Sequence, residues 1–315
     1  MKSAKTGMSR CGIVLAGGDG RRLEAFVRRV RGDALPKQYV DFTGRGSLLE
    51  QTFQRAERLI PPRRLFTVVS RGHFAFPEAW RQLADRPGGR VVVQPDNKDT
   101  APGLLLPLVR LSREYGDATV VVFPSDHAID DDAAFMAHVE RACEAVEERP
   151  SRLILLGVSP TAPEADYGYL IPGAADADGL RVVTRFAEKP GAARAAELIE
   201  RGALWNSFVM VFRASTLWEY VETLTPSLAT AFRRLAFADT PKAERAEIDE
   251  VYRRIQPVNF SSAFLRRLPG LTRPALMALD MGDVGWTDCG VEARLPGAVR
   301  EAVRGAIVDP VPLCA

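Results

Sequence analysis

The sequence predicts an α/β fold of three layers, in which helices cover both faces of a mostly parallel sheet. Short runs rich in Val, Ile and Leu alternate with amphipathic segments through the first half of the chain. Buried strands that alternate with helices in this way are typical of parallel sheets. The 315 residues are 46% hydrophobic, which is enough for one large core or two modest ones.

The first half should alternate strand and helix. Strands are expected at residues 13–16, 65–69, 91–93, 120–123 and 153–158. Helices are expected at residues 78–84, 102–115 and 133–147. A further helix should follow Ser47, because Ser-Leu-Leu-Glu matches a capping box. Its apolar face would carry Leu48, Leu49, Phe53, Leu59 and Ile60.

After residue 157 the pattern changes. A hairpin-like pair of strands is expected at 169–171 and 180–186, then a helix at 192–201, a strand at 208–212 and helices up to about 254. The sequence has no repeat and no clean linker. We therefore expect a single domain over 9–297, with two halves of about 11–125 and 126–295, and a short tail at 298–315.

Composition excludes several classes of partner. The net charge of +2, from 42 basic and 40 acidic residues, gives no reason to expect nucleic-acid binding. No apolar stretch approaches the roughly 20 residues that span a bilayer, and the N-terminus has no apolar core of a secretory signal. We expect a cytoplasmic protein with reduced thiols and no membrane partner. The oligomeric state stays open, and a homo-oligomer is possible.

The most informative segment runs from residue 13 to residue 37. A strand leads into the glycine-rich residues 17–20 and then into Arg21 and Arg22. Glycines let backbone N–H groups approach phosphate oxygens, and the arginines and Lys37 add positive charge. The third glycine of a dinucleotide fingerprint and the Gly-Lys-Ser/Thr of a P-loop are absent. A phosphate-binding loop is predicted, with a plain strand-to-helix turn as the alternative.

Two isolated acids are candidate metal ligands. Asp126 ends a buried strand, where a carboxylate needs a partner. A hard cation such as Mg²⁺ would supply one, bound by one or two carboxylates and substrate phosphates. Asp288, between small residues in Gly-Trp-Thr-Asp-Cys-Gly, could complete the same site. The alternatives are a capping role for Asp126, a loop role for Asp288 and a structural role for His127.

Polar side chains follow several other expected strands. Residues 94–102 are rich in donors and acceptors suited to a base or ribose, with Thr100 as the expected helix N-cap. The alternative is a well-capped turn. At a cleft, Lys189 could hold a phosphate and Glu188 a sugar hydroxyl, whereas on the surface they would form an unimportant ion pair. Asn206 and Gly168 could also approach a ligand there.

In this order the motifs resemble those of the sugar-1-phosphate nucleotidylyltransferases, and most of all the mannose-1-phosphate guanylyltransferase branch. The resemblance covers about residues 11–295. The matching positions of the four motifs are Gly17, Gly18, Gly20, Arg22, Leu23, Pro36 and Lys37; Asp126 and His127; Glu188, Lys189 and Pro190; and Gly285, Trp286, Asp288 and Gly290. Gln38 after Lys37, and the segment 97–102, favour the guanylyltransferase branch.

The resemblance implies a Rossmann-like three-layer αβα fold with an added sugar-binding β/α portion. It also implies transfer of a nucleotide from a triphosphate, with GTP expected, to a sugar 1-phosphate, with mannose 1-phosphate expected. The products would be a nucleotide-sugar, GDP-mannose, and pyrophosphate. The first half would bind the nucleotide and the second the sugar phosphate.

The resemblance also assigns roles to residues. Mg²⁺ would lie on Asp126 and Asp288. Arg22 and Lys37 would stabilise the leaving pyrophosphate, and Lys189 would hold the sugar phosphate. The nucleotide-binding residues would be Leu15, Ala16, Gly17, Gly18, Gly20, Arg21, Gln94, Asn97, Thr100 and Ala101. The sugar pocket would be lined by Gly168, Glu188, Lys189 and Asn206.

The chain departs from the family pattern at several positions. Arg21 replaces a usual Thr or Ser, the segment between Leu23 and Pro36 is longer and very basic, and Lys98-Asp99 lengthens the base-side loop. Phe208 stands where the family has Gly near the sugar. The chain ends soon after the last motif, so we expect no β-helix or isomerase domain.

Three alternatives to this activity stay open. They are a transferase for another base and sugar, a non-catalytic nucleotide-sugar sensor, and a nicotinamide oxidoreductase. The missing third glycine counts against the last of these.

Overall fold

A mixed sheet of nine strands runs through the part of the chain that the computed structural model describes, which is residues 9–42, 44–237, 240–271 and 276–295. The strand order is β3-β2-β1-β4-β8-β5-β9-β7-β6. The strands are β1 (Arg10–Ala16), β2 (Leu65–Ser70), β3 (Val91–Gln94), β4 (Thr119–Pro124), β5 (Leu153–Val158), β6 (Gly168–Ala175), β7 (Arg181–Glu188), β8 (Leu204–Arg213) and β9 (Leu276–Asp280).

Strand direction divides the sheet. Strands β3, β2, β1 and β4 are parallel neighbours, as are β5 and β9. Strand β8 lies between β4 and β5 and is antiparallel to both. The expected parallel sheet is thus found in the first half, and antiparallel strands interrupt it in the second. Because β6 pairs with both β7 and β8, the strands β8, β5, β9, β7 and β6 form a closed circuit.

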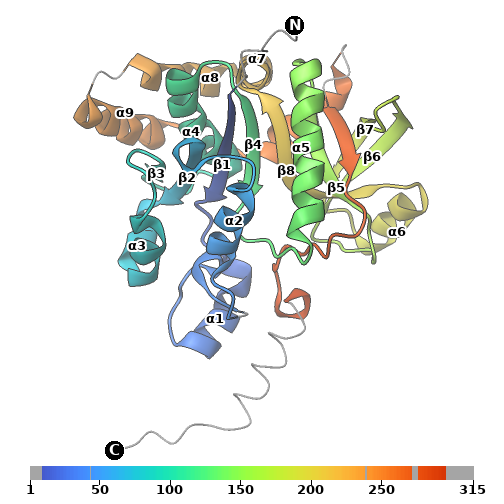
Figure 1. The fold of residues 1–315 in the computed structure, drawn as a ribbon, viewed down its shortest axis with the longest axis horizontal. Helices are drawn as coiled ribbons and strands as arrows, with labels where there is room; N and C mark the ends of the chain where they lie inside the picture. Colours follow the sequence, from blue (N-terminus) through green and yellow to red (C-terminus); the bar gives the residue numbers. More distant parts are fainter. Residues whose placement is uncertain (1–8, 43, 238–239, 272–275, 296–315) are drawn as a thin grey trace, which may run out of the picture.

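Helices cover both faces of the sheet, which confirms the α/β class (Figure 1). Successive residues of β1 point to opposite faces of the sheet, so Val14 belongs to one hydrophobic core and Ile13 to the other. The first core packs against α1 (Glu24–Arg31), α2 (Leu48–Ala56), α3 (Pro77–Ala84), α5 (Asp132–Glu148) and α6 (Ala192–Glu200). The second packs against α4 (Thr100–Tyr115), α7 (Ala214–Leu224), α8 (Pro226–Arg233) and α9 (Pro241–Arg254).

The helix starts test the capping predictions. At α2 the capping box is confirmed, since Glu50 N donates to Ser47 Oγ at 3.1 Å and Ser47 N donates to Glu50 Oε2 at 2.7 Å. At α4 the prediction of Thr100 as N-cap is wrong. The Asp99 carboxylate caps the helix by accepting from Thr100 N at 2.6 Å, and Thr100 Oγ1 accepts from Phe260 N instead.

Two elements were not expected from the sequence. Helix α1 is mostly charged and buries Phe26 and Val27, too few apolar positions for a periodic signal. Strand β9 is a short apolar run that follows helices and gains its place by pairing with β5. The other expected strands and helices are found within a few residues of their expected limits, although α2 ends at Ala56, before Leu59 and Ile60.

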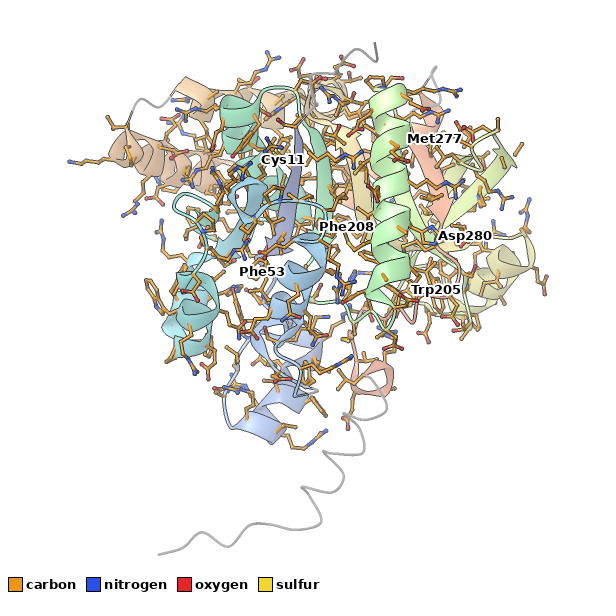
Figure 2. All side chains as sticks on the ribbon, in the orientation of Figure 1. Cys11, Phe53, Trp205, Phe208, Met277 and Asp280 are labelled. Carbon is orange, nitrogen blue, oxygen red and sulfur yellow. The ribbon has the colours of Figure 1, made fainter. Side chains whose placement is uncertain are left out.

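The C-terminal ends of β1, β4, β5 and β9 lie at one edge of the sheet. In Figure 2 this edge is the lower one, with Cys11 at the start of β1 above it and Phe208, Trp205 and Asp280 nearer to it. Loops at such an edge are where open α/β sheets bind ligands.

Three further expectations concern membrane spans, cysteines and the C-terminal tail. No described helix is long and apolar enough to cross a membrane. Cys11, Cys143 and Cys289 are buried free thiols. The expected tail at 298–315 lies outside the described residues.

Candidate active site

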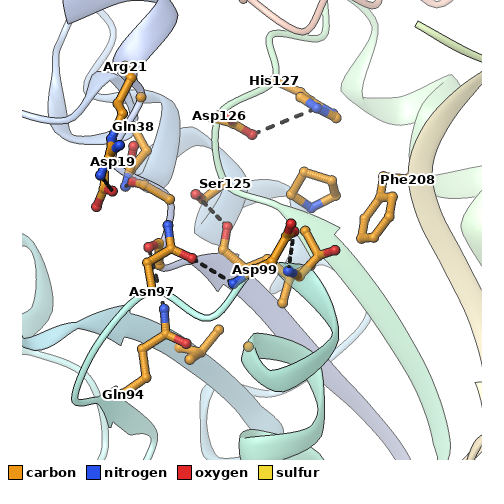
Figure 3. A pocket seen from close by; sticks show the side chains of 18 of the residues that line it. Asp19, Arg21, Gln38, Gln94, Asn97, Asp99, Ser125, Asp126, His127 and Phe208 are labelled. Atoms are coloured by element: carbon orange, nitrogen blue, oxygen red, sulfur yellow. Dashed lines mark hydrogen bonds and ion pairs between the residues drawn. The ribbon is translucent and has the colours of Figure 1, made fainter. Parts of the chain in front are cut away.

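A cleft of about 650 Å³ opens at the C-terminal edge of the sheet (Figure 3). The predicted residues that line it are Leu15, Gly17, Gly18, Gly20, Arg21, Gln94, Asn97, Thr100 and Asp126. A smaller pocket of about 240 Å³ shares Gly20, Arg21 and Asp126 with the cleft and adds Arg22, Lys37 and Gly290. Segments far apart in the sequence therefore meet around Asp126.

The glycine loop is held from behind by buried side chains. Gln38 Nε2 donates to the carbonyls of Ala16 (3.0 Å) and Gly18 (2.8 Å), and Ser70 Oγ donates to that of Gly17 (2.7 Å). Gly20 has φ +66°, which favours glycine. A Cβ on Gly17 would lie 2.5 Å from Gln94 Nε2. The loop therefore needs glycine at both positions.

The side of the cleft expected to face a base contains a side-chain amide, that of Gln94, which already has hydrogen-bond partners. Gln94 is buried, its Nε2 donates to Ser70 Oγ at 3.0 Å, and its Oε1 accepts from Tyr252 at 3.3 Å. This amide therefore fixes the neighbouring backbone. Asn97 is exposed, and its Oδ1 accepts from Asp99 N at 3.0 Å. Ala101 is fully buried and donates its N–H to Val258 O at 3.0 Å.

Lys37 joins the two candidate acids. Its ammonium is buried, 3.1 Å from Asp126 Oδ2, and it donates to the carbonyls of Asp288 (2.6 Å) and Cys289 (3.2 Å). Burial would raise the pKa of Asp126, but the Lys37 charge outweighs burial and holds the pKa below its usual value. Asp126 is therefore a carboxylate, and its side chain is 35% exposed toward solvent.

Asp288 is held by donors on both oxygens. Tyr167 (3.0 Å), Gly290 N (2.9 Å) and Arg294 Nε (3.0 Å) donate to Oδ1, and Arg22 Nη2 donates to Oδ2 at 3.2 Å. Burial acts to raise the pKa of Asp288, whereas the Lys37 and Arg294 charges lower it, and the net shift is downward. The carboxylate is fixed in place and ionised.

His127 has a defined hydrogen-bond partner. Trp286 Nε1 donates to His127 Nδ1 at 3.2 Å, so the ring proton belongs on Nε2, which lies 3.7 Å from Asp126 Oδ1. Burial lowers the pKa of His127 to about 4. The imidazole is therefore neutral near pH 7, and it lines the cleft beside Asp126.

The four expected sugar-side residues also meet. Gly168 at the start of β6 pairs with Glu188 at the end of β7, and Asn206 lies near the start of β8, whose Trp205 pairs with Tyr169. A Cβ on Gly168 would lie 2.7 Å from the Phe186 ring and 3.3 Å from Glu188 Oε2. These residues, with the exposed Lys189, lie outside the set that lines the cleft.

Comparison with protein families matches residues 11–298 to the family described as Nucleotidyl transferase. The chain belongs to this family. The xanthan biosynthesis protein XanB of Xanthomonas campestris is 34% identical over 223 residues, which are 70% of this chain and 46% of that protein. A mannose-1-phosphate guanylyltransferase of Escherichia coli is 29% identical over 223 residues, with the same two shares. The chain thus spans about half the length of these curated relatives.

A solved structure supports the assignment to the nucleotidyl transferases. The crystal structure named mannose-1-phosphate geranyltransferase from Thermus thermophilus superposes with a TM-score of 0.76 at 30% identity, covering 90% of this chain and 77% of that one. The family resemblance expected from the motifs is confirmed, and so is the Rossmann-like α/β fold.

The donor set of this nucleotidyl transferase suits a hard cation. Asp126 has carboxylate lone pairs at the cleft, and Lys37 is 3.1 Å from one of its oxygens. Asp288 is saturated by donors, of which the half-exposed Arg22 is the one best able to leave. The described residues contain no cluster of three or more metal-ligating side chains. Two carboxylates with substrate phosphates are the donor set that Mg²⁺ commonly takes in proteins, so the residues fit this ion.

Several residues of the family's cleft were not proposed from the sequence. They are Asp19, Gln38, Asp99, Ser125 and Pro257 in the cleft, with Tyr167 and Arg294 behind Asp288. Phe208, which was expected near the sugar, also lines the cleft. Gln38 directly follows Lys37, and that adjacency could have suggested it. Tyr167 reaches Asp288 across 121 residues of sequence, and Arg294, six residues after Asp288, turns back to it. No motif of the sequence marks either residue. Ala16, expected at the nucleotide, is fully buried in β1.

The basic run that departs from the family pattern is largely neutralised. Arg28 pairs with Glu24 at 2.9 Å, Arg29 with Glu292 at 2.7 Å, and Arg31 with Glu78 at 2.7 Å. Arg21 lies 3.3 Å from Asp19 and lines the cleft with its side chain 84% exposed. The extra charge therefore reaches the site through Arg21, and α1 holds the rest in surface ion pairs.

Proposed function

We propose that this chain joins a nucleoside triphosphate to a sugar 1-phosphate, giving a nucleotide-sugar and pyrophosphate. GTP and mannose 1-phosphate are the proposed substrates, and GDP-mannose the product. The observation that carries the proposal is the buried Lys37 ammonium, which joins Asp126 to the Asp288 segment beside a glycine loop. The names of the E. coli and Thermus thermophilus relatives support the choice of sugar.

The proposed step is a displacement at phosphorus. A phosphate oxygen of the sugar 1-phosphate attacks the α-phosphorus of the triphosphate, and a new P–O bond forms. The bond from the α-phosphorus to the bridging oxygen breaks, and pyrophosphate leaves with that electron pair. The nucleophile is already an anion, so no general base is needed, and catalysis consists of positioning and charge neutralisation.

The loop and its cations would hold the triphosphate. The loop carbonyls are occupied from behind by Gln38 and Ser70, which leaves the N–H groups of the loop for phosphate oxygens. Arg22 and Lys37 would stabilise the pyrophosphate, with Arg21 assisting at the mouth of the cleft. The base would lie along Asn97 and Thr100, over backbone that Gln94 fixes.

We assign Mg²⁺ to Asp126 and Asp288. When bound there, the ion would supply charge neutralisation for the two phosphate groups that react. Arg22 would then exchange Asp288 for the pyrophosphate, because its side chain is half exposed and can turn. Arg294 and Tyr167 would keep Asp288 oriented. On the sugar side, Lys189 would hold the sugar phosphate, and Glu188, Asn206 and Gly168 would line the sugar.

A substrate panel tests this proposal. The purified chain with Mg²⁺ is mixed with each of GTP, ATP, UTP, CTP and dTTP and each of mannose, glucose and fucose 1-phosphate, and pyrophosphate release is measured. The highest kcat/KM is expected for GTP with mannose 1-phosphate, with GDP-mannose identified by mass. A different best pair would keep the reaction and overturn the substrates. Binding without release by the folded chain would favour a nucleotide-sugar sensor.

A further inference from the structure

Phe208 adopts a backbone conformation that suits glycine. Its φ is +59°, in the left-handed region where a bulky side chain is strained. Such strain persists where the surrounding structure imposes it, and it is concentrated at functional sites. A glycine would satisfy the same backbone without cost, so the presence of a large ring at this position calls for a reason.

The strain arises in a bulge of β8. Leu155 pairs with Met210 and Gly157 with Asn206. Strand β8 therefore has two more residues than β5 between these two pairs. Hydrogen bonds fix this bulge: Asn206 Oδ1 accepts from Phe208 N at 3.0 Å, and Ser207 Oγ accepts from Val209 N at 3.1 Å. A bulge of this kind redirects a side chain, and the redirected side chain here is the Phe208 ring.

The ring borders the cleft opposite the glycine loop. Figure 3 shows Phe208 on one side, Asp19, Arg21 and Gln38 on the other, and Asp126 and His127 between them. Phe260, which is buried, meets the Phe208 ring edge to face at 5.8 Å between centroids. The ring is therefore supported from behind and cannot retreat easily from the cleft.

The sugar-side residues lie just beyond this ring. Asn206 is bound directly to the Phe208 backbone. Tyr169 pairs with Trp205 and Leu170 with Leu204, so the register of β6 and β8 places Gly168 opposite Asn206, and Gly168 pairs in turn with Glu188. Phe208 therefore lines the cleft beside Asn206, one of the residues proposed to line the sugar.

We propose that the Phe208 ring sets the size limit of the sugar subsite, so that unmodified hexose 1-phosphates enter and N-acetylated hexosamine 1-phosphates do not. This inference rests on the proposed function. The ring fills space that glycine would leave open, and a wall of carbon atoms offers an acetamido group no hydrogen bond.

The test compares Phe208→Gly with the wild type. The measured quantity is the kcat/KM for N-acetylglucosamine and N-acetylmannosamine 1-phosphate divided by that for the best unmodified hexose 1-phosphate. We expect the ratio to rise at least tenfold in Phe208→Gly, with KM for the triphosphate changed less than twofold. Gly accepts φ +59°, so this variant keeps the backbone of the bulge.

Two further variants separate the ring from the backbone. Phe208→Ala removes the ring but keeps the strain, and the ratio should rise as it does in the glycine variant. Phe208→Leu keeps most of the bulk, and the ratio should stay within twofold of wild type. A ratio within twofold of wild type in both Phe208→Gly and Phe208→Ala, with wild-type turnover intact, would overturn the Phe208 inference alone. No pyrophosphate release by wild type from any pair would reject the proposed function and this inference together.

Discussion

The two ends of the cleft both contain residues in the left-handed backbone conformation, but the residue types differ. At the loop end, the left-handed conformation falls on Gly20, at φ +66°. At the other end it falls on Asp99 and Phe208, at φ +69° and +59°, and on Lys189, just outside the cleft, at +45°. Cys289, whose carbonyl accepts from Lys37, also has a positive φ of +46°. Under the proposed function, glycine stands where the backbone would meet the phosphates, and larger residues hold the same conformation where a side chain would meet the substrate.

The supports behind the two ends differ as well. Behind the loop, Gln38 and Ser70 bind the loop carbonyls through buried hydrogen bonds. At the other end, Asp99 caps a helix and Asn206 fixes a bulge with its own neighbouring backbone. The far end is also tied to a distant segment, since Asn259 Nδ2 donates to Asp99 Oδ1 at 3.2 Å and Phe260 packs against Phe208. Both ends therefore depend on distant parts of the fold, but the loop end is held through its backbone carbonyls and the far end largely through side chains. The predictions below test this contrast.

The largest effect is expected at Lys37, where the two ends meet. Lys37→Ala should cost more than about 2 kcal/mol of transition-state stabilisation, by analogy with the loss of one preorganised donor. Pyrophosphate release at saturating substrates measures this loss. Lys242→Ala, which removes an exposed lysine of α9, should leave the rate unchanged. A loss below threefold in Lys37→Ala would contradict a role at the reacting phosphates.

The next effect tests the loop end. Gly17→Ala should destabilise the fold by about 1–3 kcal/mol, because the new Cβ would lie 2.5 Å from Gln94 Nε2 in a packed region. Gly18→Ala is the matched control, since no atom lies within 4 Å of its Cβ position. Urea unfolding of the three proteins gives the comparison. If Gly17→Ala and Gly18→Ala were equally stable, the loop end would accommodate the added methyl group without cost.

The next prediction tests whether the backbone strain at Lys189 lowers stability while its side chain supports activity. Lys189→Gly should raise stability by about 1 kcal/mol, because glycine relieves the strain at φ +45°. The same change should lower kcat/KM for the sugar 1-phosphate about tenfold, the worth of a hydrogen bond to a charged group. Lys189→Ala should show the same loss of activity without the gain in stability. If Lys189→Gly and Lys189→Ala were equally stable, the backbone at Lys189 would not be strained.

The smallest effect concerns His73, which lies beneath the loop. Its Nδ1 is 3.1 Å from Tyr39 Oη, and its buried Nε2 lies 3.7 Å from Asp19 Oδ1. Burial lowers the pKa of His73 in the folded state. Below about pH 6.5 the unfolded chain therefore binds the proton more readily, and the stability present above that pH is lost as the pH falls, by at most about 1.4 kcal/mol per unit.

His73→Gln should remove this part of the pH dependence. Unfolding free energies at pH 7.5 and 5.5 measure it in both proteins, and the other histidines are common to both. If His73→Gln lost as much stability on acidification as the wild type, the loop end would not depend on a neutral imidazole.

Local pattern accounts for the parts of the site that the sequence could indicate. The glycines and Arg21 follow one strand and Asp126 follows another, and parallel strands bring such ends together. The contacts of Asp288 with Tyr167 and Arg294 could not be foreseen, because they depend on how the segment 288–294 turns and packs against Tyr167. Nor could the strain at Phe208, since a bulge appears only when β8 pairs with β5. Helix α1 was missed because it is short and mostly charged, and its arginines form surface ion pairs.

The position of β8 has a consequence for how the chain folds. This strand pairs Met210 with Val122 of β4 and with Leu155 of β5, so it joins the early strands to the later ones. Until synthesis has passed β8, β4 has one neighbour and an open edge, which is prone to pair wrongly. A fragment made of residues 11–125 alone would keep that edge. The sheet can be completed only by contacts between distant parts of the chain, which form slowly, so we expect completion of the sheet to limit the folding rate.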